Sequence, residues 1–373
     1  MEITQVQSKR DLKEFIELPY RLYKDDPNWI APLRGEQQKL FTPQGNPLLE
    51  HCDYAFYLLR DGSPSDGAVI GRVTAFIDHI AVDFWKEPVG FFGSYECIDS
   101  DEAAALLLST ARRFLQEHGM KEMRGPINFN ATEWGFVVEG LNLPPMIMSP
   151  YNPAYYNRQA LNFGMRKAKD LLAFYADAGA GYVIPERFVR LLDRIAERYH
   201  VTVRTADMKY LERDTWIMVD IMNKSIAYNW GAYPVTKEEG VRLAQDLKQI
   251  VDPSVILIAE VEGKPIGFFI TLPDINVLLK GLNGHLFPIG IFRFLFGLKK
   301  IRRYRLWALG LLPEYHGKGI DTLLYYKIYE TLAPRRAYGE MNYVLEDNVK
   351  MLNPLFKMGV KPIKTYRVYT IEI

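Results

Sequence analysis

The sequence predicts an α/β protein built from two copies of one unit, and three observations lead to this prediction. Segments with the period of a strand alternate with amphipathic helical segments along the whole chain. Two similar segments, Asn162–Lys169 and Lys357–Lys364, each place a glycine just before an alternating apolar strand. Ala178–Gly181 has the small-residue composition of a linker. We therefore expect two domains, at residues 1–180 and 181–373.

The first half is interpreted, in order, as a helix, three strands, a helix, a short strand, a helix and a strand. Apolar residues that recur every three to four positions define the helices, and alternating or continuous apolar runs define the strands. Ser100 and Asp101 supply the expected cap of the longest helix. The helices are expected at 10–23, 101–118 and 155–162, and the strands at 54–59, 69–77, 89–96, near 123 and at 169–176.

The second half repeats this order. A two-strand unit turns at Glu262 and Gly263, and a strand at 364–372 is expected to complete the second copy. The helices are expected at 185–199, 210–228, 237–250, 321–332 and 349–358, and the other strands at 201–205, 255–260, 264–272, 305–312 and 340–345.

Composition and charge exclude several classes of protein. Hydrophobic residues make up 48% and charged residues 24% of the chain, as in folded globular proteins. The net charge of +1 argues against a nucleic-acid partner, because phosphate binding requires a basic excess. Cys52 and Cys97 are too few for a disulfide scaffold or a cysteine-rich metal site, so no metal is expected. No signal peptide or spanning segment is visible, which predicts a cytoplasmic protein.

The most informative segment joins a strand to a helix through the turn Pro313-Glu-Tyr-His-Gly-Lys-Gly-Ile320. Gly317 and Gly319 allow the backbone to approach a ligand closely. The turn points several N–H groups towards one place, at the positive end of a helix dipole, which suits a phosphate or pyrophosphate. It matches neither a Rossmann turn, which needs three spaced glycines, nor a P-loop, which needs Gly-Lys-Ser/Thr.

This strand, turn and helix resemble the acyl-CoA pyrophosphate loop of the GNAT N-acetyltransferase superfamily. Leu345-Glu-Asp-Asn348 followed by Leu355-Phe-Lys-Met-Gly-Val360 resembles the Asn, helix and Leu-Gly-Phe ending of that superfamily. The resemblance covers residues 200–373 closely and residues 1–177 by the order of elements alone. The whole chain therefore resembles a tandem GNAT protein. This implies two mixed, mostly antiparallel β-sheets flanked by helices, each with a splayed central strand pair.

The resemblance also implies acetyl-CoA or a longer acyl-CoA as co-substrate and assigns its contacts. The backbone of Leu309 and Leu311 would pair with the pantetheine arm, and Asn348 would lie beside the cofactor. The N–H groups of the loop would bind the pyrophosphate. These loop residues are His316, Gly317, Lys318, Gly319, Ile320 and Asp321.

Three positions depart from the superfamily pattern. His316 stands where the loop usually begins with Gln or Arg, and Asp321 where it ends with Gly or Ala. We expect Asp321 to cap its helix and face away, because an inward carboxylate would repel pyrophosphate. Leu355 occupies the position of the tyrosine that often serves as general acid, so that role is vacant or has moved. In the first half, Glu96–Ser100 carries acids where glycines are needed, so we expect one CoA site per chain.

Glu340 and Asn342 are the candidate catalytic residues. A central strand of a mostly parallel sheet is normally apolar on both faces, but Glu340-Met-Asn-Tyr-Val344 places two polar side chains on one face. N-acyl transfer needs a base for the amine and donors for the oxyanion of the tetrahedral intermediate. We interpret Glu340 as the base, directly or through water, and Asn342 as the residue that orients it. The alternative is a wet strand end, where both side chains only bond the backbone.

Weaker candidates are polar groups for which a structural role competes. Asp274 and Asn276 follow an apolar strand and are more typical of a turn. His285 and His316 have the chemistry of a base but are more often exposed bystanders. Two polar and aromatic clusters suit either an acceptor pocket or structural support, namely Arg124–Asn128 with Glu133–Gly135, and Asn229–Tyr233.

An apolar insertion, Leu286–Leu298, is followed by the basic run Lys299–Arg305. The insertion is too short to span a bilayer but fits a helix that lies on an anionic membrane surface. The alternative is an apolar flap over the core or a dimer contact. We expect peripheral membrane contact through residues 286–305, and the oligomeric state is left open.

Together these observations predict an acyl-CoA-dependent N-acyltransferase whose acceptor is a small-molecule or lipid amine. Two alternatives remain open. One is a catalytically silent acyl-CoA-binding protein, which Asp321 and Leu355 favour. The other is a transferase that resembles the peptidoglycan-bridging Fem enzymes, which use aminoacyl-tRNA, and the net charge of +1 argues against it.

Overall fold

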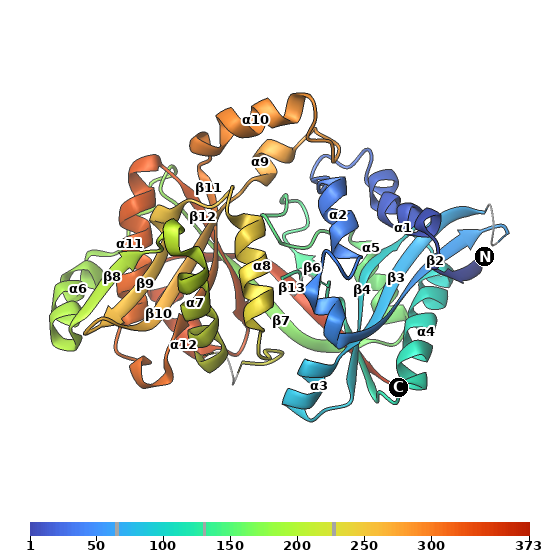
Figure 1. Cartoon of the computed structure of the whole chain (residues 1–373), viewed down its shortest axis with the longest axis horizontal. Coiled ribbons are helices and arrows are strands. Elements are labelled where there is room, and N and C mark those ends of the chain that lie inside the picture. The colour runs from blue at the N-terminus through green and yellow to red at the C-terminus, as the bar shows by residue number, and fades with distance from the viewer. Residues whose placement is uncertain (64–66, 130–131, 226–228) are drawn as a thin grey trace. The chain divides into compact units, whose positions relative to one another are not determined.

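The computed structural model describes residues 1–63, 67–129, 132–225 and 229–373, and it divides into two compact units. Unit 1 consists of Met1–Leu171, Leu279–Phe292 and Lys364–Ile373, and unit 2 of Leu172–Leu278 and Arg293–Ile363. In each unit helices flank a mixed β-sheet (Figure 1). We expected two continuous domains that meet at residue 180. In the structure, each unit is instead assembled from separate stretches of the chain.

The sheet of unit 1 has the strand order β1-β2-β3-β4-β5-β13, and β6 also pairs with β13. All of these pairs are antiparallel except β4 with β5. The strands are β1 (Glu2–Gln5), β2 (Cys52–Asp61), β3 (Ala68–Asp78), β4 (Val89–Cys97), β5 (Glu122–Gly125), β6 (Phe136–Glu139) and β13 (Lys361–Glu372). The helices are α1 (Lys9–Leu22), α2 (Arg34–Leu40), α3 (His79–Trp85), α4 (Asp101–Glu117) and α5 (Tyr155–Asn162).

Alternation along β3 separates two apolar layers in unit 1. Ala75 and Ile77 pack with the buried face of α4. Phe76, between them, points to the opposite face, where its ring lies 4.4 Å from that of Phe129. The helix α4 begins as expected, because the Ser100 side chain accepts a hydrogen bond from the Ala103 N–H.

The sheet of unit 2 has the strand order β7-β12-β11-β10-β9-β8, to which β7 contributes its residues from Leu172 onwards. The pair β11 and β12 is parallel, and the pairs from β11 to β8 are antiparallel. The strands are β7 (Arg166–Asp177), β8 (Val201–Thr205), β9 (Ile256–Val261), β10 (Lys264–Pro273), β11 (Arg303–Leu311) and β12 (Tyr338–Leu345). The helices are α6 (Glu186–Tyr199), α7 (Leu211–Ser225), α8 (Lys237–Leu247), α11 (Ile320–Leu332) and α12 (Val349–Lys357). The helices α9 (Asn276–Leu279) and α10 (Ile289–Gly297) are divided between the units, because Leu279–Phe292 belongs to unit 1.

Helices cover both faces of the unit 2 sheet. Leu257 and Phe269 pack with the buried residues of α6, α11 and α12. Their neighbours in sequence, Ile256 and Phe268, pack with α7, which crosses in front of the strands in Figure 1. The helix expected at 210–228 is present as α7 up to Ser225, and residues 226–228 lie outside the described part of the chain.

The last strand does not complete the second copy, contrary to expectation. From Lys364 onwards β13 belongs to unit 1, where Tyr369 pairs with Gly125 of β5 and Arg367 with Phe136 of β6. The final strand of the first half, β7, passes into unit 2 instead. The apolar alternation of a strand identifies its buried face, but any backbone edge can supply its partner.

The two similar segments of the sequence have the same local structure. Gly164 and Gly359 follow α5 and α12 with φ angles of +91° and +78°. After each glycine, the next N–H bonds the carbonyl five residues back, from Met165 to Ala160 and from Val360 to Leu355. Both helices therefore end in one type of glycine cap and turn directly into a strand.

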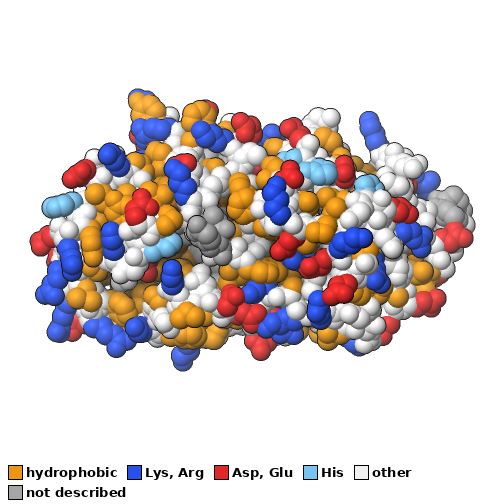
Figure 2. All heavy atoms as spheres, turned by 90° about the horizontal axis from the view of Figure 1, so that it is seen from below, with side chains coloured by type: hydrophobic (Ala, Val, Ile, Leu, Met, Phe, Trp, Pro, Cys, Tyr) orange, Lys and Arg blue, Asp and Glu red, His pale blue; other side chains and the backbone are white. Residues whose placement is uncertain are grey.

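Charges of both signs are mixed on the surface. On the face drawn in Figure 2, Lys and Arg side chains are interspersed with Asp and Glu, in keeping with the net charge of +1. Within the described ranges, the longest and most apolar helices still fall short of what crossing a bilayer requires.

Candidate functional site

The strands β11 and β12 separate from one another inside unit 2. Their parallel pairing ends at Leu306 and Met341, but β11 continues to Leu311 along β10. Beyond Leu306, no described residue of β12 pairs with β11. The expected splayed pair is therefore present, with Leu309 and Leu311 on the continuing strand, and its open edge carries backbone groups that an extended ligand can pair with.

The loop after β11 turns through two glycines into α11. Gly317 and Gly319 have φ angles of +72° and +80°, which side chains rarely allow. Among the described atoms, none lies within 4 Å of a Cβ built on Gly317, so this side of the turn is unobstructed. Gly319 is the N-cap of α11 and has no side chain with which to cap it. The first turn of the helix therefore follows directly on an unobstructed glycine turn, and the Asp321 carboxyl accepts two of its N–H groups.

Two side chains hold the loop in place. His316 Nε2 lies 2.8 Å from the carbonyl oxygen of Leu311. A carbonyl only accepts, so Nε2 carries a proton and His316 anchors the loop to the end of β11 rather than offering that nitrogen as a base. The ammonium of Lys318 lies over the rings of Tyr315 and Tyr199, 4.7 and 5.3 Å from their centroids.

The Asp321 carboxyl accepts N–H groups of the first turn of its helix, from Thr322 and from Asp321 itself, as a capping residue does. The positive φ of Gly319 starts the helix at Ile320, so Asp321 already lies inside the first turn. Burial raises the pKa of the Asp321 carboxyl, although the Thr322 amide and His316 act in the opposite direction.

A buried polar chain lies where β11 and β12 are still paired. Arg305 of β11 is in register with Glu340 of β12, and the exposed fraction of both side chains is 0%. Arg305 Nε donates to Asn342 Oδ1 at 2.6 Å, and Asn342 Nδ2 donates to Glu340 Oε1 at 3.2 Å. Asn342 is 2% exposed. The alternative of a wet strand end is therefore wrong, because these groups are buried and bond one another.

Tyr338 is the half-buried neighbour of Glu340 at the end of this row of buried polar side chains. It shares a face of β12 with Glu340 and Asn342, and its half-buried hydroxyl lies 3.5 Å from Glu340 Oε2. Burial and the neighbouring Glu340 raise the pKa of Tyr338 well above its ordinary value, so the phenol keeps its proton at neutral pH. Its ring stacks on Tyr175, and the Arg303 guanidinium lies 5.0 Å from its centroid.

Sequence reasoning missed Arg305 as a site residue and assigned it to the membrane-facing basic run. That assignment is wrong, because Arg305 is fully buried on β11. Arg303 also turns inwards, since its Nε bonds Asp274 Oδ2 at 3.1 Å. No local signal separates Arg305 from the other cations of this run, because its register with Glu340 is visible only in the fold.

The other candidates have structural contacts. Asn348 caps α12 by accepting the Met351 N–H at 3.2 Å. Leu355 is fully buried in the apolar core of unit 2, which leaves packing as its visible role. Asp274 accepts the Asn276 N–H as a turn residue, as expected. His285 is exposed.

The polar cluster of the first half supports the fold. Arg124 pairs with Glu122 at 3.0 Å, and its guanidinium lies 5.5 Å from the ring centroid of Trp85. Asn128 bonds Glu133 at 2.6 Å and accepts the Ser94 N–H at 2.6 Å.

The corresponding gap in unit 1 is filled by the chain itself. The parallel pairing of β4 with β5 ends at Phe91 and Arg124. The next segment then runs along β4, where the Ile127 N–H donates to the Phe92 carbonyl at 2.9 Å. A Cβ on Gly93 would come within 1.9 Å of the Ile127 oxygen, which shows how closely this segment approaches.

Where unit 1 would need a phosphate loop, it has a buried carboxylate. Glu96 accepts hydrogen bonds from the hydroxyls of Tyr23 and Tyr156 at 2.5 and 2.8 Å. Burial raises its pKa, and Arg72 together with the two hydroxyls offsets part of that rise. The Glu96–Ser100 segment is therefore built for internal bonding.

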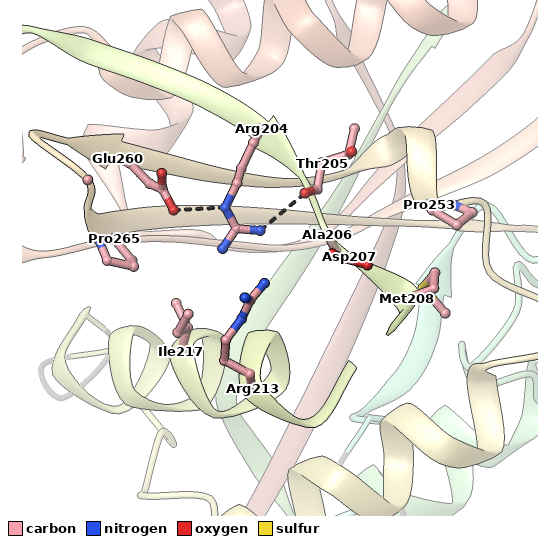
Figure 3. A pocket seen from close by; sticks show the side chains of 11 residues that line it. Arg204, Thr205, Ala206, Asp207, Met208, Arg213, Ile217, Pro253, Glu260 and Pro265 are labelled. Atoms are coloured by element: carbon pink, nitrogen blue, oxygen red, sulfur yellow. Dashed lines mark hydrogen bonds and ion pairs between the residues drawn. The ribbon is translucent and has the colours of Figure 1, made fainter. Parts of the chain in front are cut away.

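A separate hollow of about 790 Å³ opens in unit 2 (Figure 3). Two arginines line it, but Arg204 is already bonded to Glu260 at 2.8 Å and to both carboxylate oxygens of Asp214. None of the described candidate site residues lines this hollow. It is therefore distinct from the loop and from the polar chain.

Comparisons with known proteins extend over the full chain. No family model matches it. The chain is 32% identical over 374 residues to Protein YghO of Escherichia coli (strain K12), which covers 98% of this chain and 94% of that protein. It is 30% identical over 378 residues to the bacterial ceramide synthase of Caulobacter vibrioides (strain NA1000 / CB15N), with coverage of 99% and 97%. A tandem GNAT protein from the clavulanic acid biosynthesis pathway superimposes with a TM-score of 0.57 at 12% identity, covering 100% of this chain and 98% of that one, which shows a tandem GNAT fold.

Proposed function

The chain belongs to the family of bacterial ceramide synthase and Protein YghO and is an N-acyltransferase of the GNAT type, and we propose that it transfers an acyl group from acyl-CoA to a long-chain lipid amine. One observation carries the assignment of the donor site. In unit 2, β11 leaves its parallel partner and leads through a glycine turn, unobstructed at Gly317, into the N-terminus of α11.

The residues present fit the acyl-CoA substrate. The unobstructed side of Gly317 and the positive end of the α11 dipole suit a pyrophosphate. The open edge of β11, which includes Leu309 and Leu311, offers amide partners to an extended pantetheine arm. The ammonium of Lys318 adds positive charge beside the turn.

The polar chain on β11 and β12 supplies the proton transfer. The amine nitrogen forms a bond to the thioester carbonyl carbon, and its proton passes to the Tyr338 oxygen as the Tyr338 proton moves to Glu340. The C–S bond then breaks, and the proton returns along the same route to the departing thiolate. Asn342, held by Arg305, orients Glu340 throughout. This relay lets a fully buried carboxylate act as base without touching the amine.

Two arguments support a lipid amine as acceptor. The Caulobacter relative is named for ceramide, and a ceramide is the amide of a long-chain amino alcohol. The second argument is an exposed apolar face on α10, where residues three and four positions apart share one side of the helix. We call it the α10 patch, and it consists of Phe292, Leu295 and Phe296, which are 60%, 64% and 71% exposed; Phe287, which precedes the helix, is 74% exposed.

Basic residues directly follow the α10 patch. Lys299, Lys300 and Arg302 are exposed, unlike Arg305. Each basic residue near an anionic membrane surface contributes about 1 kcal/mol, so three give about 3 kcal/mol of weak and reversible binding. Apolar side chains beside them would enter the interface. We propose that this segment brings the enzyme to the membrane that contains its acceptor.

The function is tested by supplying acyl-CoA and a long-chain amino alcohol and measuring the amide product by mass spectrometry. We expect product, and we expect Glu340→Gln to lower kcat at least about 100-fold, as loss of a general base does. Glu330→Gln, an exposed carboxylate on α11, is the matched control. A folded protein that binds CoA but forms no amide with any amine tested would support the silent acyl-CoA-binding alternative instead.

A further inference from the structure

Three side chains with metal-binding chemistry meet at one corner of unit 1, outside the proposed site. His51 ends the short 3-10 helix Pro47–His51, Cys52 begins β2, and Asp78 ends β3. Cys52 and Asp78 are partners in the ladder between β2 and β3. The ligand atoms of the three side chains all lie within 4.8 Å of one another. The proposed transferase chemistry uses none of them.

One oxygen of Asp78 is incompletely satisfied. The Asp78 side chain is fully buried, and its Oδ1 accepts from His51 Nδ1 and from the Ile80 N–H, each at 3.0 Å. Its Oδ2 is also buried but has no hydrogen-bond partner among the described residues. A carboxylate oxygen left in this state is costly, so such an atom indicates a group that is bound there in the working protein.

We propose that His51, Cys52 and Asp78 bind a zinc ion. An imidazole nitrogen, a thiolate and a carboxylate are the donors that zinc prefers, and three protein ligands leave a fourth position for water. With zinc bonds of about 2.0 Å to nitrogen and oxygen, tetrahedral geometry separates those donors by about 3.3 Å. His51 Nδ1 is 3.0 Å from Asp78 Oδ1, the other oxygen of the same carboxylate, and the ligand atoms of all three residues lie within 4.8 Å of one another, so side-chain shifts can bring them around one ion.

The neighbouring pair of residues provides a matched control. His79 and Asp53 lie next to Asp78 and Cys52 in sequence, and His79 Nε2 bonds Asp53 Oδ2 at 3.0 Å. Both side chains are half exposed. Like the proposed zinc site, this pair contains a histidine and an aspartate, but it contains no cysteine and its carboxylate is not buried.

Zinc binding is measured by stripping the full-length protein with a chelator and titrating it with zinc chloride in competition with a chromophoric chelator. We expect one zinc ion per chain. Cys52→Ser and Asp78→Asn should each weaken binding about tenfold or more, and His79→Gln should bind as the wild type does. Cobalt in place of zinc should give a thiolate charge-transfer absorption that Cys52→Ser lacks. Equal zinc affinity in the wild type and in Cys52→Ser would overturn the proposal.

A second measurement avoids the variants altogether, because Asp78 also caps α3 by accepting the Ile80 and Ala81 N–H groups. Zinc bound through sulfur should slow alkylation of Cys52 in the wild-type protein, as followed by mass spectrometry of the peptide that contains it. An alkylation rate of Cys52 that zinc does not change would show that His51 and Asp78 only bond one another.

Discussion

The guanidinium of Arg305 donates through Nε to Oδ1 of Asn342 at 2.6 Å, where both side chains are buried. This bond determines how the amide is turned. Because Oδ1 faces the arginine, Nδ2 faces Glu340 and donates to its carboxylate. A cation, an amide and a carboxylate thus form one chain across the last paired residues of β11 and β12, next to the point where the strands separate.

Removing the cation should destabilise unit 2. Arg305→Met removes the hydrogen-bond donor of Asn342. It also removes the positive charge from the residue that is paired with the buried Glu340. We therefore expect the free energy of unfolding to fall by about 3 kcal/mol. Urea denaturation at pH 7 measures the change. Arg302→Met, an exposed neighbour, should have little effect. Equal midpoints for the two variants would show that the buried chain contributes nothing to stability.

Only one CoA should bind per chain. The gap beside β4 in unit 1 is occupied by the segment that contains Ile127, and Glu96 is bonded to Tyr23 and Tyr156. A ligand would have to displace these internal bonds. Titration calorimetry with CoA should therefore give a stoichiometry near one, whereas a value near two would mean that unit 1 opens to a second molecule.

Asp214 should make the protein sensitive to acid. Burial acts to raise the pKa of its carboxyl, but hydrogen bonds from Arg204, the Asp207 N–H and Arg213 outweigh burial and hold the pKa below its ordinary value. A carboxyl with a lowered pKa in the folded state stabilises the fold above about pH 4, and this stabilisation is lost as the pH falls through the folded-state pKa.

The comparison of Asp214→Asn with the wild type tests this sign. We expect the variant to be about 2 kcal/mol less stable at pH 7, and the difference to shrink below about pH 4. Asp220→Asn is the control, because Asp220 forms an exposed pair with Lys224 on the same helix. A difference that stays constant from neutral to acidic pH would contradict the assigned role of the carboxylate.

The α10 patch and the lysines after it should confer membrane binding. We expect the protein to sediment with anionic vesicles at low salt and to be released at high salt. Lys299→Gln with Lys300→Gln removes about 2 kcal/mol and so should weaken binding about 30-fold. Lys9→Gln with Lys13→Gln, exposed on α1, is the charge-matched control. Wild-type protein that stays in the supernatant at low salt would favour a lid or dimer contact for α10.

Local pattern was enough to locate much of the fold and the loop. The apolar period and Ser100 predict α4 to within a residue, and the glycines at 317 and 319 have the positive φ angles that a tight turn requires. These features depend on contacts between near neighbours in sequence, which a single sequence shows directly.

Features that depend on distant partners were not predictable in the same way. The exchange of β7 and β13 between the two halves depends on which backbone edge is open, and no side chain reports this. Arg305 looks like one more cation after an apolar insertion until its register with Glu340 is known. The short elements α2, α3, β1 and β6 are held by packing more than by their own periodicity, so they carry little signal of their own.

The central claim is that unit 2 binds acyl-CoA at the turn before α11, and Gly319 offers its most direct test. At a φ of +80°, a Cβ on Gly319 would also lie 2.8 Å from Ile195 Cδ1, so Gly319→Val must distort the turn. Gly263→Val is the matched control, because Gly263 has a φ of +75° in the turn between β9 and β10, away from the loop.

The measurement is the affinity for CoA by titration calorimetry, with folding of each variant checked by circular dichroism. We expect wild type and Gly263→Val to bind CoA alike and folded Gly319→Val to give no binding heat. Unchanged CoA affinity in folded Gly319→Val would contradict a CoA site at this turn.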